Sequence, residues 1–388
     1  MNQHAVMASH LFDGMALHRD AAVVVRRDRI AAVMPRAELP RGLPVTVLPA
    51  GAWLVPGFID IQVNGGGDVL FNDRPAPDGV RAILRAHRRF GTTAMLPTFI
   101  TDTPERTAAA VAAVQALVDE EPGVLGVHLE GPFLSPGKPG VHDLSLLRKP
   151  GGRDRALLMA PRKGAMLVTL APEEVPPGFV AGLVAAGVRV SLGHSMATYE
   201  EARAAMAEGL TGFTHLFNAM RPLGSRDPGP IAAALETPDA CYGLIADGIH
   251  IDPAVLRLAL RGAGRPMLVT DAMPPVGGSR DSFTLYGNSI AVRDGRCLRA
   301  DGTLAGSALT MIDAVRNTVR WSGWPLERVL PLASAHPAQF LGLGDVLGRL
   351  APGYRADMVA LDPGEVTVLE TWVAGDITPI AAARCRPG

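Results

Sequence analysis

Between residues 54 and 272 the sequence alternates short runs of apolar residues with segments that have the apolar spacing of helices. This alternation favours a parallel sheet with helical crossovers. Eight strands are predicted here, near residues 54–63, 92–99, 124–130, 166–170, 188–193, 212–215, 242–246 and 267–270. Eight β/α repeats over roughly 250 residues match the size of a (β/α)8 barrel. The predicted fold is therefore an α/β protein built around a (β/α)8 TIM barrel.

Three of the predicted helices have recognisable first residues. Thr103 and Asp252 are each followed by proline, which places a capping side chain before a proline at the first helical position. Residues 198–201 read T-x-x-E, which is typical of a capping box. Helices are therefore predicted to begin after these residues.

The two ends of the chain have a different pattern. Residues 21–34 predict two strands around a polar turn, and residues 356–375 predict several more. Because neither flank buries enough apolar surface alone, we expect the two ends to pair into one small β-sandwich domain beside the barrel. The predicted boundaries are 1–54 and 345–388 for the two parts of this domain and 55–344 for the barrel. A further β-hairpin is predicted at residues 283–299, before a helix that starts near Ser307.

Charge and cysteine content exclude several classes of partner. The 37 basic and 38 acidic residues give a net charge of -1, so no bulk attraction to nucleic acid or to an anionic membrane is expected. Cys241, Cys297 and Cys385 are too few and too far apart for a disulfide framework or a zinc ribbon. No secretory segment or membrane span is evident at the start or in the longest alanine-rich run. These features favour a cytoplasmic protein.

A carboxylate and two histidines stand just past predicted strands and form a candidate metal site. The segments concerned are HLEGPF (128–133), SLGHS (191–195), FTHLFNAM (213–220) and LVTDAMPP (268–275). Glu130, His194 and His215 combine a hard oxygen donor with two imidazoles, a set suited to Zn²⁺ or Fe²⁺ with open positions. Each residue alone would more often be a cap or a hydrogen-bonded core side chain. Barrel closure aims the three strand ends at one volume, which favours a metal.

Asp271, at the end of the predicted eighth strand, is the candidate catalytic base. A divalent metal lowers the pKa of its bound water, and a nearby carboxylate can accept the proton as that water attacks a carbonyl carbon. The same acid can then protonate a leaving amine. The sequence thus predicts metal-dependent amide hydrolysis, and the alternative for Asp271 is a cap on the next turn.

Eight segments, in chain order, resemble the N-acetylglucosamine-6-phosphate deacetylase family of the amidohydrolase superfamily. They are PGFIDIQVNG, HLEGPF, LGHS, THLFNAM, ADGIHI, TDAM, LAGS and PGYRADMV, and they extend from about residue 54 to residue 362. The resemblance implies an enzyme of amino-sugar metabolism that removes the acetyl group of N-acetyl-D-glucosamine 6-phosphate. It also implies one divalent metal per subunit, Zn²⁺ first, with Fe²⁺, Mn²⁺ or Co²⁺ as alternatives. A homodimer that shares an Arg or a His across its interface is expected on the same grounds.

One departure from the wider superfamily concerns the first strand. Gln62 and Asn64 stand where many members have an HxH pair for a second metal, and no lysine ends a predicted strand. The resemblance is therefore to the branch with a single tightly bound metal. Gln62 and Asn64 either support the loop or make a contact with water, metal or substrate.

The resemblance also implies substrate contacts. His142 corresponds to the histidine that contacts the sugar and helps polarise the carbonyl, and Arg226 and His250 correspond to positions that bind phosphate or sugar. Further candidates are Asn218 and Ala219, through backbone N–H groups, and Asp247, Leu304, Ala305 and Gly306. Alternatively, His142 and Arg226 are solvated loop residues and Asp247 caps a turn.

Two other hypotheses remain open. One is an amidohydrolase that acts on a cyclic amide, a nucleobase or another N-acetylated sugar phosphate. The other is a non-catalytic relative that retains the fold, which is disfavoured because all three ligand positions and the base position are filled.

Overall fold

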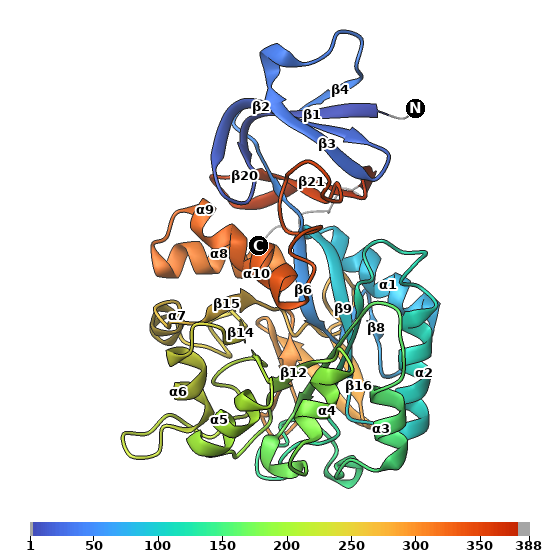
Figure 1. Cartoon of the computed structure of the whole chain (residues 1–388), viewed down its shortest axis with the longest axis vertical. Helices are drawn as coiled ribbons and strands as arrows, with labels where there is room; N and C mark the ends of the chain where they lie inside the picture. Colours follow the sequence, from blue (N-terminus) through green and yellow to red (C-terminus); the bar gives the residue numbers. More distant parts are fainter. Residues whose placement is uncertain (1–2, 379–388) are drawn as a thin grey trace.

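The computed structural model describes residues 3–378, which form a helix-covered barrel with a small β domain at one end (Figure 1). The barrel strands are β6 (Phe58–Val63), β9 (Thr92–Ile100), β10 (Gly126–Glu130), β11 (Ala165–Leu170), β12 (Arg189–Leu192), β13 (Gly212–Phe213), β14 (Cys241–Leu244) and β15 (Arg265–Leu268). Neighbouring strands in this order pair in parallel from β6 to β15. A parallel bridge between Val63 and Ala272 brings the two edges together. The predicted (β/α)8 barrel is confirmed.

Helices surround the barrel in Figure 1. They are α1 (Pro77–Arg88), α2 (Pro104–Gln115), α3 (Gly152–Leu158), α4 (Phe179–Ala185), α5 (Tyr199–Ala207), α6 (Gly229–Glu236), α7 (Pro253–Ala259), α8 (Met311–Ser322), α9 (Leu326–Val329) and α10 (Ala335–Phe340). Short 3-10 turns are η1 (Arg36–Glu38), η2 (Leu144–Leu146), η3 (Pro172–Glu174) and η4 (Leu330–Ala333). No helix within residues 3–378 is both long and apolar enough to cross a membrane.

The three predicted helix starts are confirmed by their caps. The Thr103 hydroxyl accepts a hydrogen bond from the Arg106 N–H, and the Asp252 carboxylate accepts one from the Ala254 N–H at 2.7 Å. At α5 the Thr198 hydroxyl and the Glu201 carboxylate each accept from the other residue's N–H, at 3.1 and 2.8 Å. These bonds satisfy N–H groups that a helix start otherwise leaves without partners.

The small domain joins the two ends of the chain. Its strands are β1 (Gln3–Phe12), β2 (Leu17–Arg26), β3 (Arg29–Pro35), β4 (Val45–Val47), β5 (Trp53–Pro56), β20 (Met358–Asp362), β21 (Thr367–Val373) and β22 (Asp376–Thr378). Strand β5 pairs with β1 on one side and with β20 on the other. Buried apolar residues from both ends, including Val6, Leu54, Met358 and Trp372, share one core. This confirms the predicted β-sandwich of the N- and C-terminal segments.

The predicted first strand, residues 54–63, is in fact two strands in two different sheets. Strand β5 belongs to the small domain, and β6 starts after Gly57 and enters the barrel. A Cβ atom at Gly57 would lie 2.2 Å from Oγ1 of Thr93 on β9. Only glycine therefore lets the chain pass this close to β9 as it leaves one sheet for the other.

The segment after β15 is longer and more ordered than a hairpin. Strands β16 (Ser282–Leu285), β17 (Asn288–Arg293), β18 (Arg296–Leu298) and β19 (Leu304–Ser307) form an antiparallel sheet, so the predicted two-stranded hairpin at 283–299 is part of a four-stranded sheet. The following helix begins at Met311 with Thr310 as its cap, rather than near Ser307. Ser307 instead pairs with Ala272, which holds this sheet against the turn after β15. A short β7 (Gly65–Gly66) and β8 (Val69–Leu70) ribbon follows β6.

Cys241 and Cys297 are buried free thiols, whereas Cys385 lies outside the described residues.

Candidate active site and metal centre

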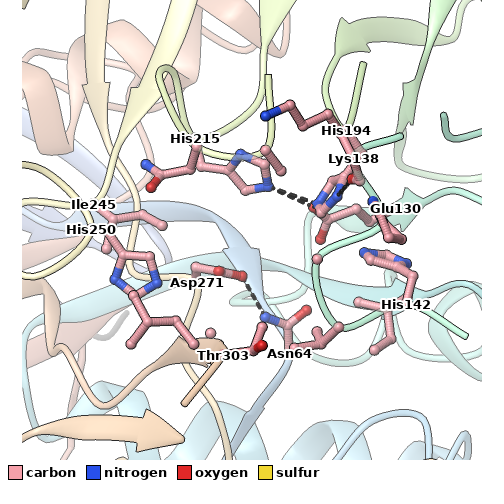
Figure 2. Close-up of a pocket in the computed structure, with 18 of the residues that line it drawn as sticks. Asn64, Glu130, Lys138, His142, His194, His215, Ile245, His250, Asp271 and Thr303 are labelled. Carbon is pink, nitrogen blue, oxygen red and sulfur yellow. Dashed lines mark hydrogen bonds and ion pairs between the residues drawn. The ribbon is translucent and has the colours of Figure 1, made fainter. Parts of the chain in front are cut away.

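A cavity of about 510 Å³ opens at the carboxyl ends of the barrel strands, where TIM barrels place their sites (Figure 2). The charged and imidazole side chains that line it are Glu130, Lys138, His142, His194, His215, His250 and Asp271. Most of the remaining lining is apolar or glycine, so these groups face one another in a poorly solvated volume.

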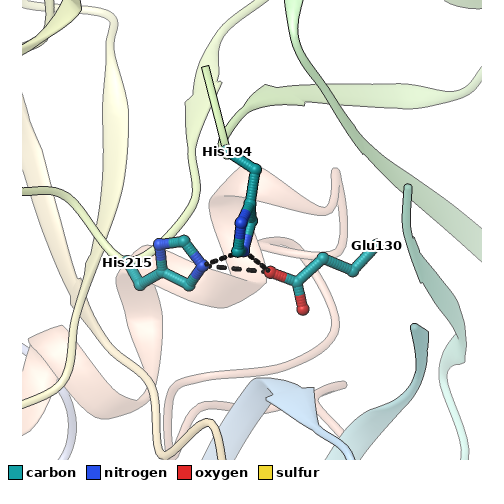
Figure 3. A group of neighbouring side chains, drawn as sticks. All are labelled: Glu130, His194 and His215. Carbon is teal, nitrogen blue, oxygen red and sulfur yellow. Dashed lines mark hydrogen bonds and ion pairs between the residues drawn. The ribbon is translucent and has the colours of Figure 1, made fainter. Parts of the chain in front are cut away.

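Glu130, His194 and His215 converge within this cavity (Figure 3). Glu130 is the last residue of β10, and the two histidines come just after β12 and β13. Oε1 of Glu130 lies 3.1 Å from Nε2 of His194 and 3.0 Å from Nε2 of His215, and the two Nε2 atoms are 3.1 Å apart. Ligands bound at about 2.0–2.1 Å around a tetrahedral Zn²⁺ lie roughly 3.3 Å apart, so a small outward shift admits an ion.

The surrounding groups prepare these atoms to bind a cation. The Nδ1–H of His194 donates to the main-chain carbonyl of Lys138 at 2.9 Å, which leaves the lone pair on Nε2. Burial raises the pKa of Glu130, but the adjacent imidazoles of His194 and His215 outweigh it and hold the pKa well below its usual range. Glu130 is therefore a carboxylate although only 2% of it is exposed. The donor set fits a divalent metal.

The backbone at the site is strained. His194, His215 and Asp271 have φ angles of +48°, +34° and +51°, in the left-handed region that side chains other than glycine rarely adopt. Each residue lies just after a barrel strand, and the reversed backbone turns its side chain into the cavity (Figure 2). Such strain persists where the surrounding structure fixes a functional group.

Asp271 faces the metal ligands across the cavity and is held by two amides. Nδ2 of Asn64 donates to its Oδ1 at 2.6 Å, and Nε2 of Gln62 donates to the same oxygen at 3.1 Å. Gln62 also points this group towards both oxygens of Glu130, at 3.4 and 3.5 Å. Burial, followed by the negative charge of Glu130, raises the pKa of Asp271 to about 6. Asp271 is thus poised to exchange a proton near neutral pH.

His142 enters the cavity from the loop after β10, and its ring centroid lies 4.5 Å from that of His194. Burial, helped by the neighbouring His194, lowers the pKa of His142 to about 3, so the ring is neutral. Nδ1 lies 2.7 Å from Oγ1 of Thr101. When the Thr101 hydroxyl donates to Nδ1, the ring proton sits on Nε2 and is available to a ligand.

Asp247 acts on His250 rather than on the cavity directly. Its Oδ2 lies 2.6 Å from Nδ1 of His250, and its Oδ1 accepts from the Ile249 and His250 N–H groups. Asp247 therefore both caps the turn, as the alternative interpretation held, and orients a cavity histidine.

The predicted substrate contacts divide into two groups. Asn64, Asn218, Ala219, His250, Leu304 and Gly306 line the cavity, whereas Gln62, Arg226, Asp247 and Ala305 do not. Ala305 is buried in the apolar cluster under β16–β19. Arg226 is exposed in the loop that projects between α5 and α6 (Figure 1). The Asn218 N–H donates to the His215 carbonyl at 2.9 Å, and Nδ2 of Asn218 donates to the Leu216 carbonyl at 3.5 Å. The Ala219 N–H and the second hydrogen on Nδ2 of Asn218 remain for a ligand.

Several residues at the site were missed by sequence reasoning. Thr101, just past β9, holds His142, and the Tyr286 hydroxyl donates to the Thr101 carbonyl from the added sheet. Lys138, Met273 and Thr303 line the cavity. The position of Thr101 at the carboxyl end of a barrel strand was the signal that could have found it. No such signal marks Tyr286, which lies in the turn between β16 and β17, because its contact with Thr101 depends on how this sheet packs against the barrel.

A model of the amidohydrolase family matches residues 53–380. The chain belongs to the amidohydrolase family. This family is metal-dependent, and the buried Glu130, His194 and His215 group is where its metal fits. Several deacetylases whose names give a sugar phosphate as the substrate are similar to this chain.

An N-acetylgalactosamine-6-phosphate deacetylase from Shewanella is 43% identical over 84% of this chain and 82% of its own length. An N-acetylglucosamine-6-phosphate deacetylase from Haemophilus influenzae is 35% identical over 89% of this chain and 91% of its own. The crystal structure of the N-acetylglucosamine-6-phosphate deacetylase from Pasteurella multocida superposes with a TM-score of 0.93 at 34% identity, covering 97% of this chain and all of that one.

Proposed function

We propose that this chain is a metal-dependent deacetylase that converts N-acetyl-D-glucosamine 6-phosphate and water into D-glucosamine 6-phosphate and acetate. The observation that carries the proposal is the convergence of Glu130, His194 and His215 in the cavity that also holds Asp271. The relatives named above support the substrate class.

The proposed metal is Zn²⁺, held by Oε1 of Glu130 and the Nε2 atoms of His194 and His215, and it is supported by the mixed carboxylate and imidazole donor set. When bound, it supplies Lewis acidity and makes water acidic enough to attack near neutral pH. Fe²⁺, Mn²⁺ and Co²⁺ suit the same donors.

The protein's own groups move the protons in this proposal. Asp271 accepts the proton of the attacking water as the C–O bond forms, and it returns that proton to the nitrogen as the C–N bond breaks. His142 donates its Nε2–H to the carbonyl oxygen, on which negative charge develops. Both interactions are strengthened because Asp271 and His142 are buried, where the local dielectric constant is lower than in water.

Recognition of the phosphate is assigned to His250, Asn218 and the Ala219 N–H, which line the cavity. Arg226 does not reach its own cavity, so we propose that it serves the cavity of a second copy in a homodimer. Its exposed position on a projecting loop supports this assignment. We further propose that the enzyme works in the cytoplasm, which the two buried free cysteines support.

The test is acetate release from N-acetyl-D-glucosamine 6-phosphate, compared with the sugar that lacks the phosphate. We expect activity on the first substrate, a kcat/KM at least roughly 100-fold lower on the second, and loss of activity with a chelator that added Zn²⁺ restores. Protein that keeps no stoichiometric metal and releases no acetate after metal addition would contradict the proposal. Comparable rates on both sugars would instead favour an amidohydrolase with another substrate.

A second candidate substrate is N-acetyl-D-galactosamine 6-phosphate, favoured by the 43% identity to the Shewanella relative. The two sugars differ only in the configuration of one hydroxyl. Measuring kcat/KM for both in parallel distinguishes the candidates.

A further inference from the structure

Asn64 has one end of its amide engaged and the other end free. The side chain stands directly after β6 and is 1% exposed. Nδ2 donates to Oδ1 of Asp271 at 2.6 Å, and this fixes the orientation of the amide, because the reverse would set an oxygen against the carboxylate. In Figure 2 the amide oxygen lies on the end away from Asp271, on the side of His142.

The oxygen of this amide is a buried acceptor without a partner. Within residues 3–378, Oδ1 of Asn64 accepts no hydrogen bond and is shielded from solvent, although the residue lines the cavity. Buried polar atoms in folded proteins nearly always have partners, and an exception at a functional site points to a ligand. The missing partner is a donor, since a carbonyl oxygen only accepts.

The two amides also make the oxygens of Asp271 unequal. Nδ2 of Asn64 and Nε2 of Gln62 both donate to Oδ1, whereas no hydrogen bond to Oδ2 is found in the described part of the chain. Oδ1 is thus saturated by donors, and Oδ2 is the oxygen left to carry a proton. The group that receives this proton must come close to Oδ2, and hence close to Asn64.

We infer that Oδ1 of Asn64 accepts the N–H of the scissile amide, while Asn64 and Gln62 together reserve Oδ2 of Asp271 for proton transfer. This inference rests on the proposed function. Water gives its proton to Oδ2 as the C–O bond forms, and Oδ2 gives that proton to nitrogen as the C–N bond breaks. The original N–H stays on nitrogen throughout, so the products are the carboxylic acid and the amine.

The inferred hydrogen bond from the scissile N–H to Oδ1 of Asn64 sets the geometry at the nitrogen. As the carbonyl carbon becomes tetrahedral, the nitrogen becomes pyramidal and gains a lone pair. Holding its N–H at Asn64 directs that lone pair towards Oδ2 of Asp271, which protonates it. An ester oxygen at the same place has no hydrogen, so it would set a lone pair against Oδ1 of Asn64.

The test therefore compares an amide with an ester. The two substrates are N-acetyl-D-glucosamine 6-phosphate and glucose 6-phosphate acetylated on the 2-hydroxyl. Asn64→Ala removes both the acceptor and one donor to Asp271. Gln62→Ala is the matched control, because it removes a donor to the same Asp271 oxygen and leaves the acceptor in place. It also removes the longer contacts of Gln62 with Glu130, which the metal content takes into account. Metal content and melting temperature are measured for each variant, and Asn64→Ser replaces Asn64→Ala if the latter does not fold.

We expect Asn64→Ala to lower kcat/KM for the amide roughly 10-fold to 100-fold more than for the ester. Gln62→Ala should lower both by a similar factor. Equal losses on amide and ester in Asn64→Ala would overturn the inference and leave Asn64 as a support for Asp271 alone. A wild-type enzyme that hydrolyses neither substrate would instead remove the proposed function on which the inference rests.

Discussion

The main-chain carbonyl of Lys138 accepts a hydrogen bond of 2.9 Å from Nδ1 of His194, while the Lys138 side chain lines the same cavity (Figure 2). One loop residue thus orients a candidate metal ligand through its backbone carbonyl, and the same residue lines the cavity that we propose binds the substrate. The two roles can be separated, because side-chain substitution leaves the carbonyl in place.

Replacing Lys138 with methionine is expected to weaken binding of the anionic substrate without loss of metal. The variant keeps the carbonyl that holds His194 and removes the positive charge, so KM for N-acetyl-D-glucosamine 6-phosphate should rise about 10-fold with little change in kcat. Steady-state kinetics and metal analysis check this. Lys163→Met is the control, since Lys163 pairs with Asp119 at the surface. A Lys138→Met enzyme with unchanged KM would show that the ammonium does not meet the substrate.

Gly140→Ala is expected to lower metal affinity. Gly140 has a φ of +56°, and a Cβ atom there would lie 3.0 Å from Cε1 of His194. The added methyl group should push the imidazole out of line and cost roughly 10-fold to 100-fold in metal affinity. Competition against a metal-binding dye measures the effect.

Gly287→Ala is the matched control for that experiment. Gly287 has a φ of +75°, and no atom lies within 4 Å of the position of its Cβ. Both substitutions should lower the free energy of unfolding by about 1 kcal/mol through backbone strain. Equal metal affinity in the two variants would mean that a side chain at position 140 does not disturb His194, and that glycine is needed there only for its backbone conformation.

Thr101→Val should lower kcat by roughly 10-fold, because the hydroxyl that selects the tautomer of His142 is lost. Thr93→Val is the comparison. The Thr93 hydroxyl donates to the Phe58 carbonyl at 3.1 Å at the start of β9, away from the cavity, so its loss should affect stability and not kcat. If the pH profile and kcat of Thr101→Val match those of the wild type, Thr101 does not position His142.

Asp60 predicts a decline in the stability of the metal-free protein as the pH rises. The side chain is fully buried, and burial raises its pKa to about 7 despite the 2.5 Å hydrogen bond from the Thr270 hydroxyl. A raised folded-state pKa means that the folded protein holds the proton more tightly than the unfolded chain. Its stabilising contribution is complete below pH 4 and is lost as the pH rises through about 7.

Asp60→Asn should abolish this part of the pH dependence. The interval from 3.8 to about 7, at 1.36 kcal/mol per pH unit, corresponds to roughly 4 kcal/mol. Urea unfolding of both proteins, with chelator, at several pH values between 4 and 8 gives the difference. Parallel curves for wild type and Asp60→Asn would exclude a titrating Asp60.

The barrel and the grouping of Glu130, His194, His215 and Asp271 could be predicted from the sequence, since strand periodicity identifies strand ends and parallel closure brings those ends together. Contacts that depend on loop geometry could not be predicted from the sequence. The position of Thr101 at a strand end marks it as a site candidate, but its hydrogen bond with His142 spans 41 residues, and no local pattern predicts that pairing. The division of residues 54–63 between two sheets was equally hidden, because an apolar run does not show which sheet it joins.

Strand β5 pairs with one strand that is synthesised before it and with one that is synthesised after the barrel. It ends at Pro56 and pairs with β1 on one edge. Its other edge has no partner until β20, which begins at Met358, has been synthesised. During synthesis, nearly the whole barrel emerges from the ribosome while that edge still presents bare backbone N–H and C=O groups to other chains. The small domain is therefore completed only once β20 has been made, and chains that stop before Met358 should be the ones that need a chaperone.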